Sequence, residues 1–257
     1  MKIGFFGMSH LGLNYLAASA TRGFEVVGYD KSETLIRDLN LGYKIFNEPN
    51  LFEKIKVNKK KILFTNKITN FRDCSIIFIS SDVPTNTKGE SDLSFIKKNI
   101  KDIERKFSNK NLIIMSQVYP GFTEGLKWKK NKLFYQVETL VFGQAFIRAF
   151  KPERIILGVH NLNKKINRKI LNYYKKFNCP VLKTNFRTSE LIKISINLYL
   201  ISSITTTNII SSICKKIGAK WNDIENSLRM DRRIGKYAYL KPGLGISGGN
   251  LERDLTN

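Results

Sequence analysis

Short continuous runs of apolar residues alternate with helical patterns over the first part of the chain. Continuous runs are typical of strands that helices cover on both faces of a parallel sheet. The expected strands are Lys2–Phe6, Glu25–Tyr29, Ile62–Phe64, Ser75–Ser80, Asn111–Ser116 and Arg154–Gly158. The expected helices between them are Leu11–Arg22, Lys31–Leu39, Phe95–Phe107 and Phe122–Lys129, and Phe146–Phe150 leads into the sixth strand. This alternation predicts an α/β fold built on a doubly wound parallel sheet.

A different pattern follows Gly158. A basic amphipathic helix, over about residues 162–177, leads to the short strand Pro180–Lys183. A long helix is expected from about Thr188 to Ile217, and Gly218 marks its end. Because this helix is apolar almost all round, we expect it to be buried on several sides, either inside the subunit or against a partner chain. We therefore expect two domains, an α/β domain at 1–184 and a mostly helical domain with a long central helix at 185–257.

The turn after the first strand has the glycine pattern of a dinucleotide site. Gly7-Met8-Ser9-His10-Leu11-Gly12 follows G-x-G-x-x-G, with Ser9 in place of the middle glycine. In this pattern the first glycine makes a tight turn, the second admits the pyrophosphate, and the third lets the helix pack closely, with the phosphates at the helix N-terminus. Because serine has a Cβ, Ser9 is expected to weaken or shift binding. The segment predicts a Rossmann-type nucleotide-binding domain, and the alternative is an ordinary βαβ unit that binds nothing.

Asp30 ends the second strand, where such domains hold the adenosine ribose. Its carboxylate accepts hydrogen bonds from the ribose hydroxyls and repels a 2′-phosphate. That repulsion amounts to about 4 kcal/mol per unit charge at about 4 Å in an effective dielectric near 20. The sequence therefore favours NAD over NADP, and the adjacent Lys31 is expected to soften the preference.

The charge balance is strongly basic. The chain of 257 residues has 44 Lys and Arg against 21 Asp and Glu, a net charge of +23. One interpretation is an anionic partner, and the other is a lysine-rich bias on solvated faces. The basic residues form short scattered runs, and no zinc-finger, RNA-binding or homeodomain signature accompanies them. We therefore do not expect a nucleic-acid partner.

The cysteines and the apolar segments indicate a cytoplasmic protein. Cys74, Cys179 and Cys214 lie far apart without a C-x-x-C pair, so neither a disulfide framework nor a metal site is expected. The N-terminal residues do not form a signal peptide, and the most apolar stretch, Ile192–Ile204, is too short to cross a bilayer. His10 and His160 show no partner pattern, and structural roles are expected for both.

Further motifs follow in order along the chain. They are Val26-Val27-Gly28-Tyr29-Asp30, Glu48-Pro49-x-Leu51, Ser80-Ser81-Asp82-Val83-Pro84-Thr85, Ser116-Gln117-Val118-Tyr119-Pro120-Gly121, Tyr135-Gln136-Val137-Glu138-Thr139-Leu140, Ser189-Glu190-Leu191-Ile192-Lys193 with Asn197, Asp231-x-Arg233-Ile234-Gly235, and Pro242-Gly243-x-Gly245 through Asp254. Together they resemble the UDP-glucose/GDP-mannose dehydrogenase family from Met1 to Asp254. That family oxidises the C6 hydroxyl of a nucleotide sugar twice with NAD, the second time through a thioester on a cysteine. The resemblance implies a nucleotide-sugar substrate, NAD as cofactor, and a homodimer through the helix at 188–217.

The resemblance also assigns roles to individual residues. The implied catalytic residues are Lys193 and Asn197, which hold the oxygen at the reacting carbon, Glu138, which handles a proton or positions water, and Asp254, which orients the catalytic water and lysine. The implied cofactor-binding residues are Gly7, Ser9, His10, Leu11, Gly12, Asp30, Ser81, Thr85 and Gln117. The implied substrate-binding residues are Arg233, which reaches the nucleotide of the neighbouring subunit, Gly245 and Asn250. The alternative for Lys193 is a side chain that reaches solvent, and for Glu138 a loop carboxylate that only binds backbone amides.

Several positions depart from the family pattern. Asn250 stands where the family has its nucleophilic cysteine, and an amide cannot form a thioester. By sequence position, none of the three cysteines replaces it. Phe142 stands where the family has a second glutamate, and Gln117 where it has a threonine. The sequence ends at Asn257, so the family's C-terminal domain is expected to be absent.

These departures leave three functions open. The first is an NAD-dependent nucleotide-sugar dehydrogenase, altered to a single oxidation step or dependent on a separate chain for its third domain. The second is a catalytically inactive NAD-binding partner in polysaccharide synthesis. The third is a binding protein that uses its basic surface.

Overall fold

The computed structural model describes residues 1–84, 86 and 91–243 of the chain. These residues fall into two compact units. The first contains residues 1–84 and 92–193, and the second contains residues 85–91 and 194–257. In the described part of the chain, no helix is long and apolar enough to cross a membrane.

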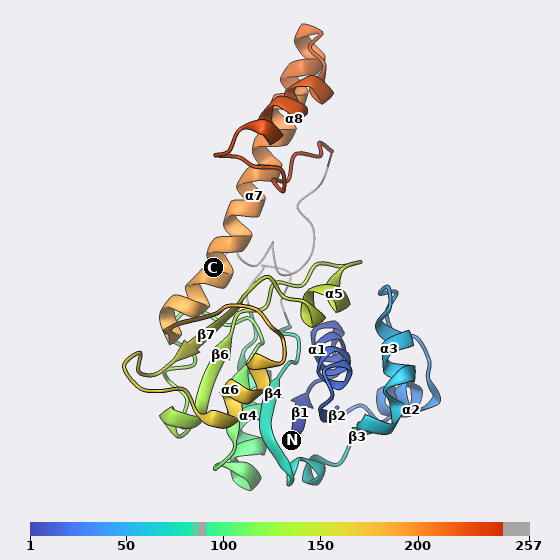
Figure 1. Cartoon of the computed structure of the whole chain (residues 1–257), viewed down its shortest axis with the longest axis vertical. Helices are drawn as coiled ribbons and strands as arrows, with labels where there is room; N and C mark the ends of the chain where they lie inside the picture. Colours follow the sequence, from blue (N-terminus) through green and yellow to red (C-terminus); the bar gives the residue numbers. More distant parts are fainter. Residues whose placement is uncertain (85, 87–90, 244–257) are drawn as a thin grey trace. The chain divides into compact units, whose positions relative to one another are not determined.

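An eight-stranded sheet forms the centre of the first unit (Figure 1), with the strand order β3-β2-β1-β4-β5-β6-β7-β8. The strands are β1 Lys2–Phe6, β2 Glu25–Tyr29, β3 Ile62–Thr65, β4 Cys74–Ile79, β5 Asn111–Ile114, β6 Leu133–Gln136, β7 Ile155–Val159 and β8 Val181–Asn185. Neighbouring strands are parallel except for β6 and β7, which are antiparallel. The predicted α/β class with a doubly wound, mostly parallel sheet is confirmed.

Helices cover this sheet and give it two cores. They are α1 His10–Thr21, α2 Glu33–Leu41, α3 Leu51–Val57, α4 Ser94–Phe107, α5 Ala145–Phe150 and α6 Arg168–Lys175, with 3-10 turns η1 Lys59–Lys61, η2 Ile68–Phe71 and η3 Lys130–Lys132. Helix α1 contacts both α5 and α3. Alternate residues of β1 serve opposite faces: Ile3 and Phe5 join the core beneath α1, whereas the Phe6 ring contacts Tyr29 and Phe71. Burial on both faces explains why the strands are continuous apolar runs.

The strand order places a switch of winding direction between β1 and β4. From β1 the chain continues to β2 and β3 on one side of the sheet, and from β4 to β5 and β6 on the other. In open α/β sheets, ligands bind at the carboxyl ends of the strands that flank this switch. Gly7 follows β1 and Ser80 follows β4, so the glycine turn lies at the position where the fold itself forms a crevice.

The second unit consists mainly of helices. Helix α7, Phe186–Ile217, begins in the first unit and continues into the second, where α8, Trp221–Met230, follows. Along α7 the buried residues Ile201, Ile204, Ser211 and Cys214 recur at three- and four-residue helical spacing or multiples of it. Within the second unit, Thr207 donates a hydrogen bond to the carbonyl of Tyr239 at 3.0 Å. The predicted long central helix is confirmed.

Two expected elements differ in the structure because side chains bind backbone groups. The expected helix Phe122–Lys129 is wrong, since residues 120–125 form turns and residues 126–128 are irregular. The Glu190 carboxylate accepts the N–H groups of Gly121 and Thr123, which holds the start of this segment in a loop. Helix α6 is shorter than expected and begins only at Arg168, because Asn167 caps it there and the Asn161 side chain holds a turn by accepting the N–H of Asn163.

Candidate functional site

The glycine turn requires glycine at both of its outer positions. Gly7 has a φ of +100°, and a Cβ there would lie 2.3 Å from Ser81 Oγ. A Cβ on Gly12 would lie 2.0 Å from the carbonyl oxygen of Gly7. These contacts correspond to two roles of the dinucleotide pattern, the tight turn after β1 and the close packing of α1 on that turn.

Ser9 is accommodated without backbone strain and serves as the N-cap of α1. Its φ of −65° and ψ of 176° are extended. Its hydroxyl donates to the carbonyl of Ser80 at 2.7 Å and accepts the N–H of Gly12 at 3.3 Å. Serine is among the best N-cap residues because it satisfies such a donor. The Ser9 side chain is therefore bonded within the protein, and its expected effect on cofactor affinity stays a prediction.

The first turn of α1 retains unused backbone donors. Within the described part of the chain, the N–H groups of His10 and Leu11 have no hydrogen-bond acceptor. Donors of this kind at a helix N-terminus, together with the helix dipole, favour an anion such as a diphosphate. The turn that precedes them is closed by the Ser80 hydroxyl, which donates to the carbonyl of Gly7 at 3.0 Å.

Asp30 holds the turn and keeps acceptor capacity. Its Oδ2 accepts the N–H of Met8 at 2.9 Å and its Oδ1 accepts the N–H of Ser32 at 3.0 Å. Each carboxylate oxygen has two lone pairs, so one acceptor position on each remains for a ribose hydroxyl. The Lys31 ammonium binds Asn99 at 2.9 Å and Asp102 at 3.1 Å, and the expectation that it softens the charge of Asp30 stays a prediction.

Ser81 and Gln117 continue the carboxyl edge beyond β4 and β5, and both are buried. The Ser81 hydroxyl donates to the carbonyl of Phe6 at 3.3 Å, and Ser116 donates to the carbonyl of Ser81 at 2.6 Å. These bonds connect the loops after three neighbouring strands. The Ser81 side chain thus ties the loop after β4 to the end of β1.

His10 belongs to a cluster that the sequence does not predict. Its Nε2 lies 2.9 Å from Glu48 Oε2, and its ring stacks on Phe142 with centroids 4.4 Å apart. Glu48 also accepts the N–H groups of Gly143 at 3.1 Å and Ala145 at 2.8 Å. Burial alone would raise the pKa of Glu48, but the hydrogen bonds from His10, Gly143 and Ala145 outweigh it and hold this pKa below its ordinary value. The sequence shows no pattern that indicates these partners, and the contacts place His10 in a structural cluster.

Lys193 and Glu138 form a buried ion pair within the first unit. Lys193 Nζ lies 2.7 Å from Glu138 Oε1, and the two side chains are 7% and 12% exposed. The other carboxylate oxygen of Glu138 accepts the N–H of Leu140 at 3.0 Å. Lys193 thus does not reach solvent, and Glu138 binds more than backbone amides. Burying an ion pair to this extent costs free energy of folding, because both charges lose their hydration. Such pairs recur where a site needs a fixed charge.

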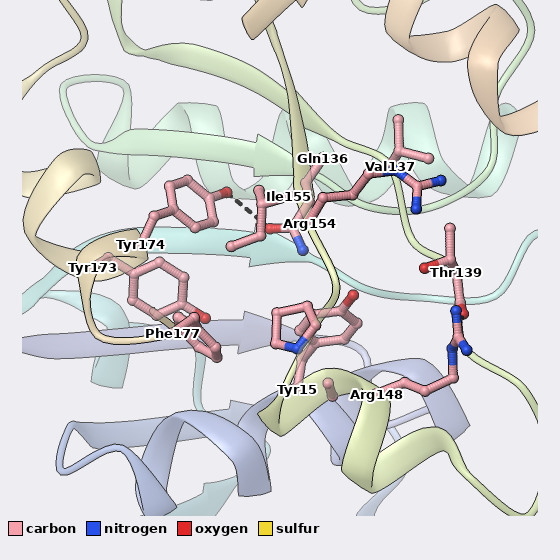
Figure 2. Close-up of a pocket in the computed structure, with 12 residues that line it drawn as sticks. Tyr15, Gln136, Val137, Thr139, Arg148, Arg154, Ile155, Tyr173, Tyr174 and Phe177 are labelled. Carbon is pink, nitrogen blue, oxygen red and sulfur yellow. Dashed lines mark hydrogen bonds between the residues drawn. The ribbon is translucent and has the colours of Figure 1, made fainter. Parts of the chain in front are cut away.

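Buried tyrosines support the strand that leads to Glu138. The Tyr174 hydroxyl donates at 2.8 Å to Gln136, the last residue of β6, and Figure 2 shows this bond beside Tyr15 and Tyr173. Burial raises the pKa values of these three tyrosines above the ordinary phenol value, so their hydroxyls stay protonated. The cavity between them has a volume of about 10 Å³, room for about one water. This region holds Glu138 in place and is too small for a substrate.

Glu190 positions the loop after β5 from one helical turn before Lys193. It is fully buried, and its carboxylate accepts the N–H of Gly121 at 2.5 Å and that of Thr123 at 2.8 Å. Burial raises the pKa of Glu190 above its ordinary value, against the opposing effect of these hydrogen bonds. The beginning of α7 is thereby fixed to the carboxyl edge of the sheet.

The remaining predicted residues lie outside this cluster. Asn197 is four residues after Lys193 on α7, a spacing that places two side chains on one helix face, and it belongs to the second unit. Arg233, also in the second unit, is exposed and binds Asp231 at 2.6 Å. Thr85, Gly245, Asn250 and Asp254 lie outside the described residues.

Cys74 lies at the edge of the sheet opposite the dinucleotide turn, because it begins β4, whereas Gly7 and Glu138 follow the carboxyl-terminal ends of β1 and β6. Cys179 precedes β8, which runs antiparallel to β6, so it lies at the same edge as Glu138. Burial raises the pKa of the Cys74 thiol to about 12. A thiol that stays protonated in this way is a poor nucleophile. Cys74 is therefore not placed to react at the carboxyl edge.

The described residues of the first unit fit a dinucleotide. The turn is shaped by two glycines whose side chains would collide with the protein, α1 offers free N–H groups, and Asp30 has acceptor positions left. These are the three features that hold the diphosphate and the ribose in Rossmann domains.

Family models match nearly the whole chain. Residues 1–178 match the NAD binding domain of the UDP-glucose/GDP-mannose dehydrogenase family, and residues 187–257 match the central domain of that family. The prediction that NAD is the cofactor is confirmed at the level of this domain.

Two relatives match almost the whole length of this chain. The chain is 30% identical to a UDP-glucose 6-dehydrogenase of Bacillus subtilis, over 99% of this chain and 58% of that protein. It is 32% identical to an uncharacterised protein of Methanocaldococcus jannaschii, over 99% of this chain and 30% of the relative. The chain therefore spans less than two thirds of the length of these relatives.

Solved structures share the fold. A UDP-glucose dehydrogenase from Pyrobaculum islandicum has a TM-score of 0.88 at 24% identity, over 99% of this chain and 62% of that one. A GDP-mannose dehydrogenase from Pseudomonas aeruginosa has a TM-score of 0.83 at 23% identity, over 96% of this chain and 61% of that one. At these identities the likeness concerns the arrangement of the backbone.

Proposed function

Because this chain belongs to the UDP-glucose/GDP-mannose dehydrogenase family, we propose that it is an NAD-dependent oxidoreductase that oxidises the C6 hydroxyl of a nucleotide sugar. The observation that carries the proposal is the buried Lys193–Glu138 pair, with 2.7 Å between Nζ and Oε1. It lies in the same unit as the dinucleotide turn, and a protein that only binds NAD has no need of a buried charge pair at that edge. A charge held out of solvent is the kind of group that oxidation of an alcohol requires.

In this proposal the first unit holds the cofactor at the β1–β4 switch. The N–H groups of His10 and Leu11 bind the diphosphate, and the Asp30 carboxylate accepts the ribose hydroxyls. Bound there, NAD supplies the acceptor for the hydride that leaves the substrate carbon. Lys31 is bound to Asp102 at 3.1 Å, and the charge of Asp30 acts against the 2′-phosphate of NADP.

Lys193 and Glu138 handle the proton and the charge on the substrate oxygen. When an alcohol becomes an aldehyde, its carbon loses a hydride and its oxygen loses a proton. The Glu138 carboxylate accepts this proton, and the Lys193 ammonium stabilises the negative charge that develops on the oxygen. Asn197, on the same helix face one turn later, adds an amide donor to that oxygen. Arg233 is proposed to reach the substrate nucleotide of the neighbouring subunit, and the proposed roles of Gly245, Asn250 and Asp254 concern residues outside the described part of the chain.

The residue at position 250 limits the reaction to its first stage. Oxidation beyond the aldehyde proceeds in this family through a thioester, and Asn250 has no nucleophilic atom to form one. We propose a one-step oxidation to the aldehyde, or an enzyme that depends on a separate chain for its third domain. The same substitution, together with Phe142 in place of a glutamate, favours one alternative, an inactive NAD-binding partner in polysaccharide synthesis.

Stoichiometric turnover with candidate sugars tests the proposal. We expect incubation with NAD and UDP-glucose or GDP-mannose to form one NADH per sugar, measured by absorbance, and Glu138→Gln to lower kcat by at least about a hundredfold. Glu153→Gln, which removes an exposed carboxylate, is the matched control and should not alter kcat. No NADH with either sugar, while calorimetry shows NAD binding that Asp30→Ala weakens, would establish the inactive partner instead.

A further inference from the structure

A second pocket lies at the amino-terminal edge of the sheet, opposite the dinucleotide turn. It is formed where β4 and β5 begin, just before β6 begins, and where α6 starts, and its volume is about 300 Å³. Its lining includes Lys110, Lys132, Lys169 and the single acid Asp73. The dehydrogenase chemistry proposed above uses none of these residues. The whole pocket belongs to the first unit.

The charge of this pocket is positive and uncompensated. Among the described residues, none of the three lysines forms an ion pair. Lys132 donates to the carbonyl of Asn109 at 2.9 Å and to its side-chain oxygen at 2.5 Å, and Lys110 donates to the carbonyl of Arg72 at 2.5 Å. Each ammonium has three donors, so these bonds orient Lys110 and Lys132 and still leave N–H groups for a ligand. Three cations against one acid favour an anion in the pocket.

The wall of the pocket is built in advance by asparagines. Asn111 is buried, and its side chain donates to the carbonyl of Ser75 at 3.0 Å and accepts a bond from Asn167 at 3.1 Å. Asn167 is also the N-cap of α6, so the positive end of that helix dipole points at the same edge. A rigid polar wall lowers the cost of ordering groups around a bound ion.

We propose that this pocket binds the phosphate group of a small phosphorylated molecule, at a site separate from the dinucleotide turn. Its volume lies at the lower end of the range for small-molecule pockets, about 300–1,000 Å³. Its three lysines come from separate segments of the chain and line one pocket. Nucleic acid, by contrast, is bound along an extended basic stripe. The pocket therefore favours a compact oxyanion. Such a site would account for part of the excess of basic over acidic residues.

Calorimetry with inorganic pyrophosphate, at fixed ionic strength and with saturating NAD to fill the dinucleotide turn, tests this site. We expect the double substitution Lys110→Gln and Lys132→Gln to weaken pyrophosphate binding by at least about tenfold, because it removes two charge-assisted contacts. The matched control is Lys59→Gln with Lys60→Gln, the same charge change in η1, which does not line the pocket. It should change the affinity by less than about twofold.

A variant of opposite sign separates binding from folding. Asp73→Asn removes the acid at the pocket, and it should tighten pyrophosphate binding by about threefold, a gain that misfolding cannot produce. Equal melting temperatures and NAD affinities confirm that the variants are folded. Equal weakening in the pocket and control variants, no gain with Asp73→Asn, or preferential binding of duplex DNA with a steep salt dependence would each overturn the proposal.

Discussion

A single buried carboxylate, Glu48, joins three segments that lie far apart in the sequence. It binds His10 at the start of α1 and the N–H groups of Gly143 and Ala145 at the start of α5. Through these bonds it connects the dinucleotide turn to the loop that follows Glu138. The cofactor side and the proposed catalytic side of the first unit thus depend on one residue.

Replacement of Glu48 by glutamine tests this role. An amide has a single oxygen acceptor and cannot satisfy three donors, so Glu48→Gln should destabilise the protein by about 1–3 kcal/mol at pH 7. The folded-state pKa of Glu48 is lowered, so its contribution is present above the unfolded pKa of 4.5 and is lost as the pH falls through the lower folded value. Urea unfolding at pH 7 and at pH 3 measures both effects.

The exposed residue Glu53 provides the control for this experiment. Glu53→Gln should leave the free energy of unfolding within about 0.5 kcal/mol of the wild type at both pH values. The interpretation of Glu48 is wrong if Glu48→Gln costs as much at pH 3 as at pH 7. Such a result would mean that the shape of the side chain matters and its charge does not.

At the residue scale, the sequence predicts the parts of the site that are local. Gly7, Ser9 and Asp30 stand in one βαβ unit, where spacing alone fixes their relation. The His10–Glu48 bond joins residues separated by 38 positions, and Glu48 reaches Ala145 across 97. Periodicity does not relate residues that are so far apart in the sequence. The motif Glu48-Pro49 marks the position of the glutamate, but it does not indicate which residues the carboxylate binds.

At the scale of elements, α7 carries an unusual surface for a helix of one chain. Opposite its buried stripe, the side chains of Ile209, Ile213 and Ile217 are 57%, 48% and 72% exposed, at four-residue spacing on one face. Tyr199 is 79% exposed two turns or more before them. The sequence leaves open whether this helix is buried inside the subunit or against a partner, and contiguous exposed apolar residues favour a partner.

We expect two copies of the chain to associate through this face of α7. Ile209→Lys with Ile213→Lys places two charges on the face and should convert a dimer to a monomer in size-exclusion chromatography with light scattering. Because both positions are exposed in the single chain, the melting temperature of the isolated monomer should change little. Asn222→Lys, which adds one charge on the exposed side of α8, is the control and should leave the dimer intact. A wild-type protein that is monomeric at micromolar concentration contradicts this assignment.

Element prediction succeeds where the local pattern and the tertiary structure agree. The expected strands at β1 and β2 match the observed ones, because both are apolar runs between clear breaks. Strand β6 is not among the expected strands, since its four residues obtain their structure from pairing with β5 and β7. The segment 122–129 has a helical pattern, but Leu126 and Trp128 bind carbonyls only three and two residues back. Thr123 is held by Glu190, a residue that the local sequence does not contain.

At the scale of the whole molecule, the order of strands around the β1–β4 switch follows from the alternation of elements. The antiparallel pairing of β6 with β7 does not, because it depends on a connection whose helix, α5, has only six residues. The charge is the other global property, and the sequence leaves its origin open. The pocket at the amino-terminal edge concentrates three lysines, and many other basic residues lie elsewhere on the surface.

The stability of the whole molecule should therefore rise with salt. Even if each of the 21 acids were paired with a cation, 44 minus 21, or 23, cations would stay unpaired, so repulsion exceeds the attraction of ion pairs. The Debye length falls from about 30 Å at 0.01 M salt to about 8 Å at 0.15 M, which screens this repulsion. We expect the free energy of unfolding to rise by about 1 kcal/mol over this range of salt. For a chain of this size, that raises the melting temperature by about 2–4 °C.

The substitution of Lys59, Lys60 and Lys61 by glutamate isolates this effect. Each change removes two units of charge, so three changes take the net charge from +23 to 23 minus 6, or +17. These lysines form η1 and are not in the pocket lining, so the variant should keep its pyrophosphate affinity while its melting temperature depends less on sodium chloride. Melting between 0.01 and 0.15 M salt checks both proteins. A wild-type melting temperature that falls with salt would mean that the ion pairs, such as Lys193 with Glu138, contribute more to stability than the excess charge removes.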